Sequence, residues 1–224
     1  VGIAVAVRDW SGYYPVAHEG GGNMDKSMVM KWFQDVLNTE TTKIFHNAMY
    51  DVCFIRAAGL KIFGKIVDTM IAGSLVDENR FRYDLGSLGR DYVGRGKNEA
   101  VLAETAKEWG IDAKSEMYKL PAMYVGAYAE ADAQLTLDLW QEMKKEIINQ
   151  DIEDIFKLET ELFPCLVDMR FLGVRVDTEA AYELKQKLLT EEKECLRIVQ
   201  KETGVDAQIW AARSIAQVFE KLHL

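Results

Sequence analysis

The sequence is poor in the residues that build disulfide frameworks and soft-metal sites. Its three cysteines, Cys53, Cys165 and Cys195, are odd in number and far apart. They predict neither a disulfide framework nor a Cys-x-x-Cys zinc site, which indicates a reducing, cytoplasmic setting. The three histidines are equally scattered, so we do not expect a histidine-based metal site.

Long hydrophobic runs are also missing. No apolar stretch approaches the roughly 18 to 20 residues that a membrane-spanning helix needs, so no membrane association is expected. The apolar run at 1–7 has no basic flank and no small-residue cleavage site, and it predicts a strand rather than a signal peptide. Because Val1 stands where a start methionine would, we expect the chain to be a fragment.

The sequence has no surplus of basic residues. Its 27 lysines and arginines face 36 acidic residues, for a net charge of −9. This balance argues against binding of nucleic acid through a general basic surface. An enzyme that gathers carboxylates around metal ions can nevertheless be acidic overall. The composition, 49% hydrophobic and 28% charged, is typical of a globular protein.

Up to about residue 150, short β-rich runs alternate with helical patterns. Two such runs on either side of Asp9–Gly12 predict a hairpin. Further strands and helices are predicted at 43–45, 65–67, 85–93, 99–109 and 122–148. Short strands followed by helices favour an α/β domain with a mixed sheet. The remainder is almost entirely helical, so we expect one domain at 1–150 and a second, helical one at 151–224.

The first group of residues with catalytic potential lies directly after a predicted strand. Asn47 and Asp51 are four residues apart at the start of a helix, which places them on the same side. Such a pair can combine a hydrogen-bond donor with a metal-binding carboxylate at the edge of a sheet. An N-capping Asn with a first-turn Asp, favoured by the helix dipole, has the same pattern. The spacing alone leaves both interpretations open.

The second group lies within the long helix predicted at 122–148. Tyr128 and Asp132 share one face of this helix because they too are four residues apart. A phenol beside a metal-bound carboxylate can orient an attacking water molecule. An amphipathic helix with a half-buried tyrosine has the same spacing, so this group is also ambiguous by itself.

Together the two groups resemble the second and third motifs of the DnaQ-like (DEDDy) 3′→5′ exonucleases. The segment His46–Asp51 is similar to the family pattern H-N-x-x-[FY]-D, and Tyr128–Asp132 is similar to the later Y-x-x-x-D. Between them, Val67–Met70 and Tyr83–Leu88 resemble the D-T-M and L-x-S-L stretches of polymerase-linked members. The resemblance covers almost the whole chain.

The last third resembles the sequence that follows the exonuclease in family A DNA polymerases. Leu158–Leu166 and Gly173–Asp177 are similar to its L-E…G-V-x-V-D stretch, and Val205–Leu222 is similar, more loosely, to the start of the thumb. The chain is therefore identified as the 3′→5′ exonuclease region, and the start of the polymerase region, of a family A DNA polymerase. A phage and a cellular parent both remain open.

The resemblance implies a ribonuclease H-like exonuclease fold with a mixed sheet, followed by an all-helical segment. In that family a D-x-E motif on the central strand supplies two of the four metal ligands. It is absent here, so we expect this first strand and its two ligands upstream of Val1. Asp177–Glu179 also spells D-x-E, but it follows the other motifs and precedes a helix. We therefore interpret Asp177 as an N-cap.

The chemistry that the resemblance implies is two-metal hydrolysis of 3′-terminal phosphodiesters in DNA replication. Mg²⁺ or Mn²⁺ ions would activate a water molecule and stabilise the leaving 3′ oxygen. Asp51 and Asp132 would be metal ligands, Tyr128 would orient the water, and Asn47 would contact the terminal nucleotide. The implied partner is a single-stranded 3′ end of DNA, bound by a monomer in the cytoplasm of a bacterial or phage-infected cell.

Two other functions remain possible from the sequence. One is a degenerate, non-catalytic exonuclease module that serves as scaffold and DNA contact, and the other is a ribonuclease of the RNase D type. Presence of all four site residues argues against the first, and the polymerase-like region after 150 argues against the second. Phe81, Tyr83 and Tyr118 are candidates for separating the last bases, although core positions are the more common role of such residues. With two ligands lacking, we expect the isolated chain to be inactive.

Overall fold

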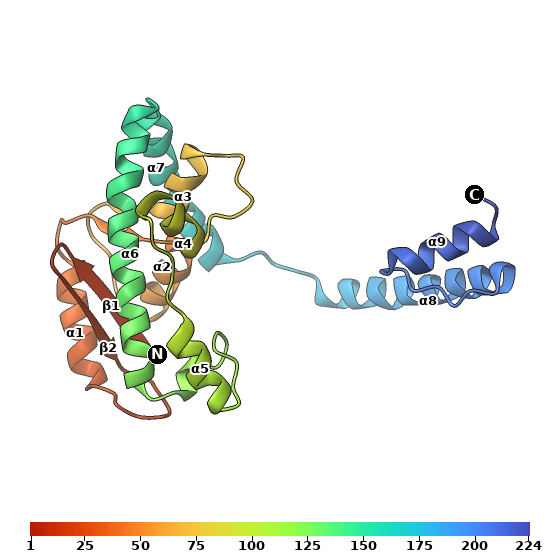
Figure 1. Ribbon diagram of the computed structural model, residues 1–224, viewed down its shortest axis with the longest axis horizontal. Helices are drawn as coiled ribbons and strands as arrows, with labels where there is room; N and C mark the ends of the chain where they lie inside the picture. Colours follow the sequence, from red (N-terminus) through yellow and green to blue (C-terminus); the bar gives the residue numbers. More distant parts are fainter. The chain divides into compact units, whose positions relative to one another are not determined.

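The chain begins with the hairpin that the sequence predicts. In the computed structural model, which describes residues 1–224, β1 (Gly2–Val7) pairs antiparallel with β2 (Trp10–Pro15) (Figure 1). The turn falls at Arg8 and Asp9 rather than at 9–12, because Trp10 and Ser11 already pair with β1.

A second pair of strands is parallel. β3 (Lys43–Phe45) pairs with β4 (Ile66–Asp68), and α2 (Ala48–Ala57) lies in the crossover that connects them. The prediction of an α/β domain with parallel and antiparallel pairing is therefore confirmed. The strands nevertheless form two separate two-stranded sheets instead of one mixed sheet, and each sheet has edges without a strand partner.

Helices cover both faces of these strands. On one face α1 (Lys26–Leu37) and α2 share an apolar cluster with β1 and β3, in which Phe33 and Ile55 are buried against Val5. On the other face, α6 (Ala122–Asn149) runs along the hairpin and also contacts β3 (Figure 1). The two sheets therefore occupy one layer between the same helices, an arrangement typical of α/β domains.

The largest buried cluster lies beside this layer, where α6 packs against the helices between β4 and α5. Leu88, Leu139 and Met143 are completely buried in it. The remaining elements of this part of the chain are α3 (Thr69–Val76), α4 (Leu85–Leu88), a π-helix η1 (Gly89–Val93), α5 (Ala100–Glu108), a 3₁₀ turn η2 (Met117–Lys119) and α7 (Glu153–Leu172).

The first compact unit extends to the end of α7, at Leu172. Phe163 and Val167 of α7 are buried against Ala48 and Val52 of α2, so this helix packs on the α/β core. The break in packing therefore lies after Leu172, later than the boundary near 150 that the change of sequence character predicts.

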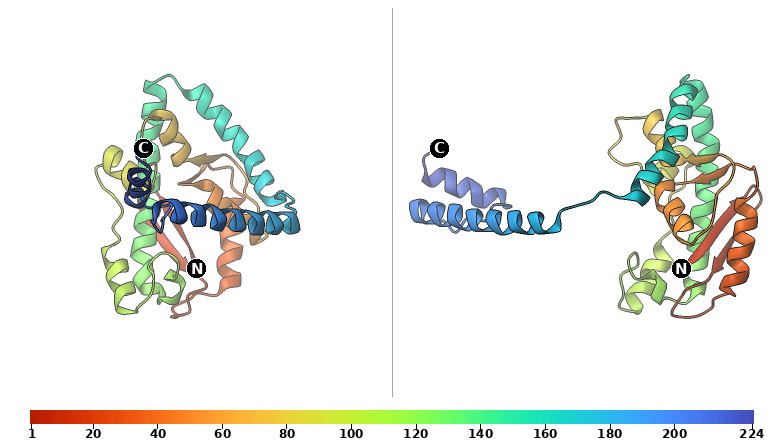
Figure 2. Two further views of the ribbon diagram at one scale, coloured as in Figure 1. Left: turned by 90° about the vertical axis from the view of Figure 1, so that its right-hand side faces the viewer. Right: turned by 180° about the vertical axis from the view of Figure 1, so that it is seen from behind.

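The second unit, Gly173–Leu224, consists of two helices that pack on each other (Figure 2). α8 (Thr178–Thr203) begins at Asp177, whose carboxylate accepts hydrogen bonds from the N–H groups of Glu179 and Ala180. The predicted N-cap role of Asp177 is thus confirmed. α9 (Ala212–Lys221) follows. No helix in either unit combines the length and apolarity required to cross a bilayer.

Candidate active site

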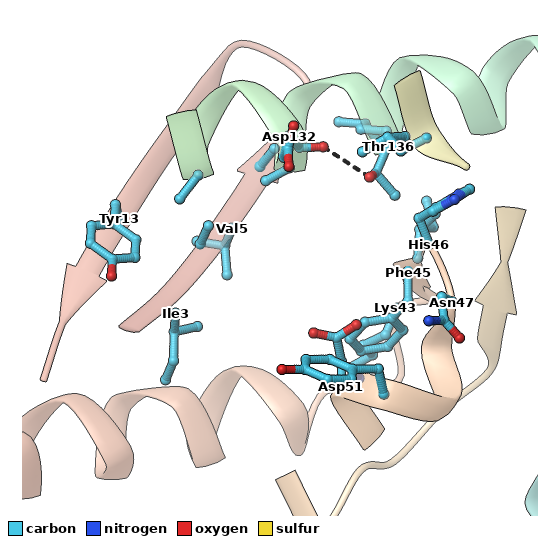
Figure 3. A pocket seen from close by; sticks show the side chains of 18 of the residues that line it. Ile3, Val5, Tyr13, Lys43, Phe45, His46, Asn47, Asp51, Asp132 and Thr136 are labelled. Carbon is cyan, nitrogen blue, oxygen red and sulfur yellow. Dashed lines mark hydrogen bonds between the residues drawn. The ribbon is translucent and has the colours of Figure 1, made fainter. Parts of the chain in front are cut away.

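A cavity of about 2140 Å³ lies within the first unit, between the two sheets. β1 contributes Ile3 and Val5 to its wall, and β3 contributes Lys43 and Phe45 (Figure 3). The helices that cover the strands complete the lining, α1 and α2 on one side and α6 on the other. Figure 3 shows the strands and helices surrounding the open space.

Asp51 reaches this cavity from the first turn of α2. Its side chain is half-buried, and burial raises the pKa of the carboxyl to about 6, with a smaller contribution from the negative charge of Asp68. A carboxyl group whose charge is this poorly solvated is a good ligand for a cation.

The start of α2 is held by Asp68 from the neighbouring strand. One oxygen of the buried Asp68 carboxylate accepts from the N–H of Asn47 at 2.9 Å, and the other accepts from Ala48 at 2.7 Å. The first oxygen also accepts from Met70 at 2.8 Å, which caps α3. The cap on α3 is local in sequence, whereas the bonds to Asn47 and Ala48 join residues about 20 positions apart. Asp68 thus joins the starts of two helices and determines where Asp51 lies.

A second link runs between the same two segments. The ring Nδ1 of His46 lies 2.9 Å from the hydroxyl oxygen of Thr69, and that hydroxyl lies 3.1 Å from the carbonyl of Phe45. The His-Asn and Asp-Thr-Met stretches therefore interact through hydrogen bonds across the parallel strands. Burial lowers the pKa of His46, so the imidazole is neutral at pH 7.

Asn47 occupies the N-cap position of α2 without acting as a cap. Its backbone is left-handed, with φ of 62°, and its side chain makes no capping hydrogen bond. Asparagine tolerates this conformation better than most residues. The side chain is exposed and lines the same cavity as Asp51. The alternative interpretation of Asn47, as the residue that caps α2 with its side chain, is therefore wrong.

Tyr128 and Asp132 line the cavity from α6. Asp132 lies across the open space from Asp51 (Figure 3). Burial raises the pKa of the half-buried Tyr128 phenol, so the phenol is protonated at neutral pH. The four residues that the sequence singles out therefore line one cavity, although nearly half of the first unit separates the two pairs along the chain.

Lys97 is a site residue that the sequence reasoning missed. Its ammonium lies 2.7 Å from the Asp132 Oδ2 atom and donates a hydrogen bond to the Tyr128 hydroxyl, also at 2.7 Å. Burial alone would lower the pKa of Lys97, but the hydrogen bonds to Asp132 and Tyr128 outweigh it and raise the pKa to about 12. The sequence carries only a weak signal for this residue, the glycines Gly94 and Gly96 just before it.

The residues of this cavity fit one part of a divalent-metal site. Asp51 and Asp132 face each other with carboxylate oxygens, the donors that Mg²⁺ and Mn²⁺ prefer. Nowhere in the chain do three or more His, Cys, Asp or Glu side chains gather in a way that could hold a metal ion. The donor type therefore fits, while further ligands are needed for a pair of ions.

The aromatic candidates for contacts with the terminal bases differ in exposure. The Tyr83 hydroxyl donates to the carbonyl of Asp77 at 2.8 Å, and its ring packs against the main core. Phe81, in contrast, is fully exposed, which corrects the core position favoured from sequence. Tyr118 is partly exposed. Phe81 and Tyr83 both lie in the irregular segment between α3 and α4, so only the folded structure distinguishes them.

Comparison with known proteins identifies the family of the chain. Residues 3–148 match the model of a family described as 3′-5′ exonuclease, DNA polymerase A type. The chain is 32% identical to a DNA-directed DNA polymerase of Pseudomonas phage M6, over 99% of its own length and 34% of the relative. It is 25% identical to DNA polymerase DpoZ of Salmonella phage PMBT28, over 98% of the chain and 35% of the relative.

Cellular DNA polymerases are also among the relatives. DNA polymerase I of Chloroflexus aurantiacus is 27% identical over 82% of this chain and 19% of its own length. The chain thus spans about a third of the length of the phage polymerases that it resembles and less of the cellular one.

Proposed function

Because the chain belongs to the 3′-5′ exonuclease family of family A DNA polymerases, we propose that it is the proofreading region of such a polymerase. It would remove nucleotides from a single-stranded 3′ end of DNA. The observation that carries this proposal is that Asn47, Asp51, Tyr128 and Asp132 line a single cavity. The residues come from two separate elements, the start of α2 and the helix α6. Helix capping and amphipathicity act within one helix and would not bring the two pairs together.

The proposal includes one more strand in the sheet. β1 and β3 both lack a partner on one edge, both line the cavity, and both lie between the same helices. Isolated two-stranded sheets are marginally stable, and unpaired edges tend to acquire partners. A strand between β1 and β3 would join the pairs into one mixed sheet in the order β2-β1-new strand-β3-β4. This is the support for a ribonuclease H-like fold.

Such a strand would run between Asp51 and Asp132. A D-x-E motif on it would add carboxylates to the two that this chain provides, and thus complete the ligands for a pair of Mg²⁺ or Mn²⁺ ions. Bound ions of this kind stabilise negative charge on phosphoryl oxygens and generate a nucleophilic hydroxide from water.

The chain's own residues would orient the substrate and the water. The Tyr128 phenol is protonated and can donate a hydrogen bond to the attacking water. Asn47 immediately precedes α2, and its exposed side-chain amide lines the same cavity. It would contact the terminal nucleotide. Asp51 and Asp132 would hold metal from opposite walls.

The first prediction tests this assignment. In the full-length polymerase, Asp51→Ala or Asp132→Ala should abolish 3′→5′ degradation of single-stranded DNA, because each removes a ligand from a site whose geometry is the catalyst. Nucleotide incorporation should change little. Asp35→Ala, which removes an exposed carboxylate from α1, serves as the control and should leave both activities at the parental level.

The same assay separates the alternatives. Degradation at the parental rate by both cavity variants would refute the site, and absence of degradation by the parental enzyme would indicate a scaffold module instead. A parental enzyme that degrades RNA in preference to DNA would favour the RNase D type.

A further inference from the structure

Lys97 links the two proposed catalytic side chains of α6. Its ammonium contacts the Asp132 carboxylate and the Tyr128 hydroxyl at 2.7 Å each, and Glu99 lies next at 3.8 Å. We propose that Lys97 is a positioning residue of the exonuclease site. Its ammonium holds the phenol and the carboxylate in register and takes the cation position beside Asp132 until a divalent ion binds. The inference rests on the proposed exonuclease function.

Close packing of the backbone around η1 places Lys97 beside Tyr128 and Asp132. The segment that carries it follows the π-helix η1 and Gly94, whose φ is 76°. π-helical turns are rare and frequently lie at functional sites. A Cβ atom added at Gly89, the first residue of η1, would lie 2.7 Å from the Arg95 carbonyl oxygen. The segment that leads to Lys97 therefore packs directly against η1, with no room for a side chain between them.

The stem of Lys97 is also confined. A Cβ atom added at Gly86 of α4 would lie 3.3 Å from the Lys97 Cγ, which shows how closely the lysine passes over this helix. The Lys97 side chain is only 25% exposed, unlike a lysine that extends freely into solvent. Its ammonium therefore has a defined location, because the stem passes close over Gly86.

The contact with Tyr128 determines the direction of the phenol proton. A lysine ammonium carries three donors and no acceptor, so the Tyr128 oxygen must accept from it. The phenol O–H then points away from Lys97, towards the Asp132 carboxylate or a water molecule in the cavity. Lys97 thus acts on the reaction through Tyr128, without contacting the reacting atoms.

The contact with Asp132 opposes metal binding. A divalent ion held by the same carboxylate would lie close to the ammonium, and like charges repel strongly in a half-buried site. Removal of the ammonium should therefore strengthen metal binding at Asp132 while it slows turnover. A purely structural lysine would behave differently, because its loss would weaken folding, metal binding and turnover together.

The test compares Lys97→Met and Lys97→Arg with the parental full-length polymerase. Mn²⁺ binding is measured by electron paramagnetic resonance, and the Asp132→Asn protein is subtracted as the blank for all other ion sites. We expect Lys97→Met to bind Mn²⁺ about 3- to 10-fold more tightly at this site. Lys97→Arg keeps the positive charge and should stay near the parental affinity. Lys145→Met removes an exposed ion pair with Glu142 on α6 and is the matched control.

Degradation of a single-stranded oligonucleotide provides the second measurement. At saturating Mn²⁺, Lys97→Met should lower kcat by about 10- to 100-fold with little change in KM, because the phenol is no longer oriented. Lys97→Arg should recover part of this loss, and Lys145→Met should match the parent. Thermal unfolding of each variant shows whether a loss of activity reflects a loss of folding.

Two results would overturn the inference. One is a Lys97→Met protein with the parental rate and Mn²⁺ affinity, and the other is a variant that binds Mn²⁺ more weakly and unfolds at a lower temperature. In both cases the proposed function stands as long as the parent degrades DNA and Asp132→Ala does not. A parental rate for Asp132→Ala would instead refute the proposed function, and the inference with it.

Discussion

At the scale of single residues, Asp51 is placed where its charge is unfavourable. Burial raises its pKa from 3.8 to about 6, so at neutral pH the folded protein contains an ionised carboxyl group that is poorly solvated. The stability that Asp51 contributes is fully present below pH 3.8 and is lost as the pH rises through about 6. A free-energy cost of this kind is typical of carboxyl groups at functional sites, including those that bind cations.

Asp51→Asn should therefore stabilise the protein at pH 7.5 in the presence of EDTA. We expect the free energy of unfolding to rise by about 1 to 3 kcal/mol, because the neutral amide has no charge to desolvate. Near pH 4 the parental carboxyl is itself protonated, and the difference should vanish. Urea unfolding of both proteins at the two pH values measures this, with Asp35→Asn as an exposed control. An equal gain at both pH values would contradict the electrostatic explanation.

Tyr128→Phe removes only the hydroxyl that is proposed to orient the water. In the full-length polymerase it should slow hydrolysis of single-stranded DNA by about ten- to a thousandfold. The thermal midpoint should change little, since the aromatic ring and its packing remain. Tyr124→Phe, one turn earlier on α6 and outside the cavity lining, is the control. A sharp fall in thermal midpoint together with activity would favour a structural role for Tyr128.

At the scale of elements, the start of α2 depends on a residue that is distant in sequence. Asp68 accepts three backbone hydrogen bonds, two from the start of α2 and one from α3, and it is only 8% exposed. Asp25, which caps α1, is exposed and accepts from one backbone N–H. These two aspartates therefore offer a direct comparison of a shared, buried cap with a single, exposed one.

Asp68→Ala should lower the free energy of unfolding by about 2 to 4 kcal/mol, because it leaves buried N–H groups without acceptors. Asp25→Ala should cost about 1 kcal/mol. The Asp68 variant should also lose exonuclease activity in the full-length polymerase, since the turn that carries Asp51 is no longer held. Urea unfolding gives both energies, and equal costs for the two variants would refute the shared cap.

At the scale of the whole molecule, the open edges of β1 and β3 predict that residues 1–224 alone are incomplete. We expect this chain to be inactive as a nuclease and to unfold with low cooperativity, because its strands lack a shared partner. An upstream extension that includes the D-x-E strand should restore both Mg²⁺-dependent activity and cooperative unfolding.

A paired assay of the two chains on a 3′-labelled oligonucleotide measures this, with EDTA as the metal-free control. Release of mononucleotides by residues 1–224 that EDTA abolishes would show that the metal site is complete without the added strand. The proposed place of the missing ligands would then be wrong.

The sequence by itself determined the features that depend on neighbouring residues. The helix starts at Asp25, Asp68 and Asp177 follow from side chains that bond N–H groups two or three positions ahead. The long helix α6 and the hairpin follow from periodicity and turn residues. The motif around Asp51 and that around Tyr128 could likewise be read directly, because each is confined to a single turn of helix.

Only the tertiary structure decided what depends on residues that are distant in the chain. The placement of Asp51 across a cavity from Asp132 and the contact of Lys97 with Asp132 require the packing of α6 beside the strands. The second cap made by Asp68 requires the pairing of β3 with β4. The extension of the first unit to Leu172 has the same origin, since α7 is held by burial against α2. Local patterns cannot reveal these contacts, because the energy that makes them arises from surfaces that meet only in the folded chain.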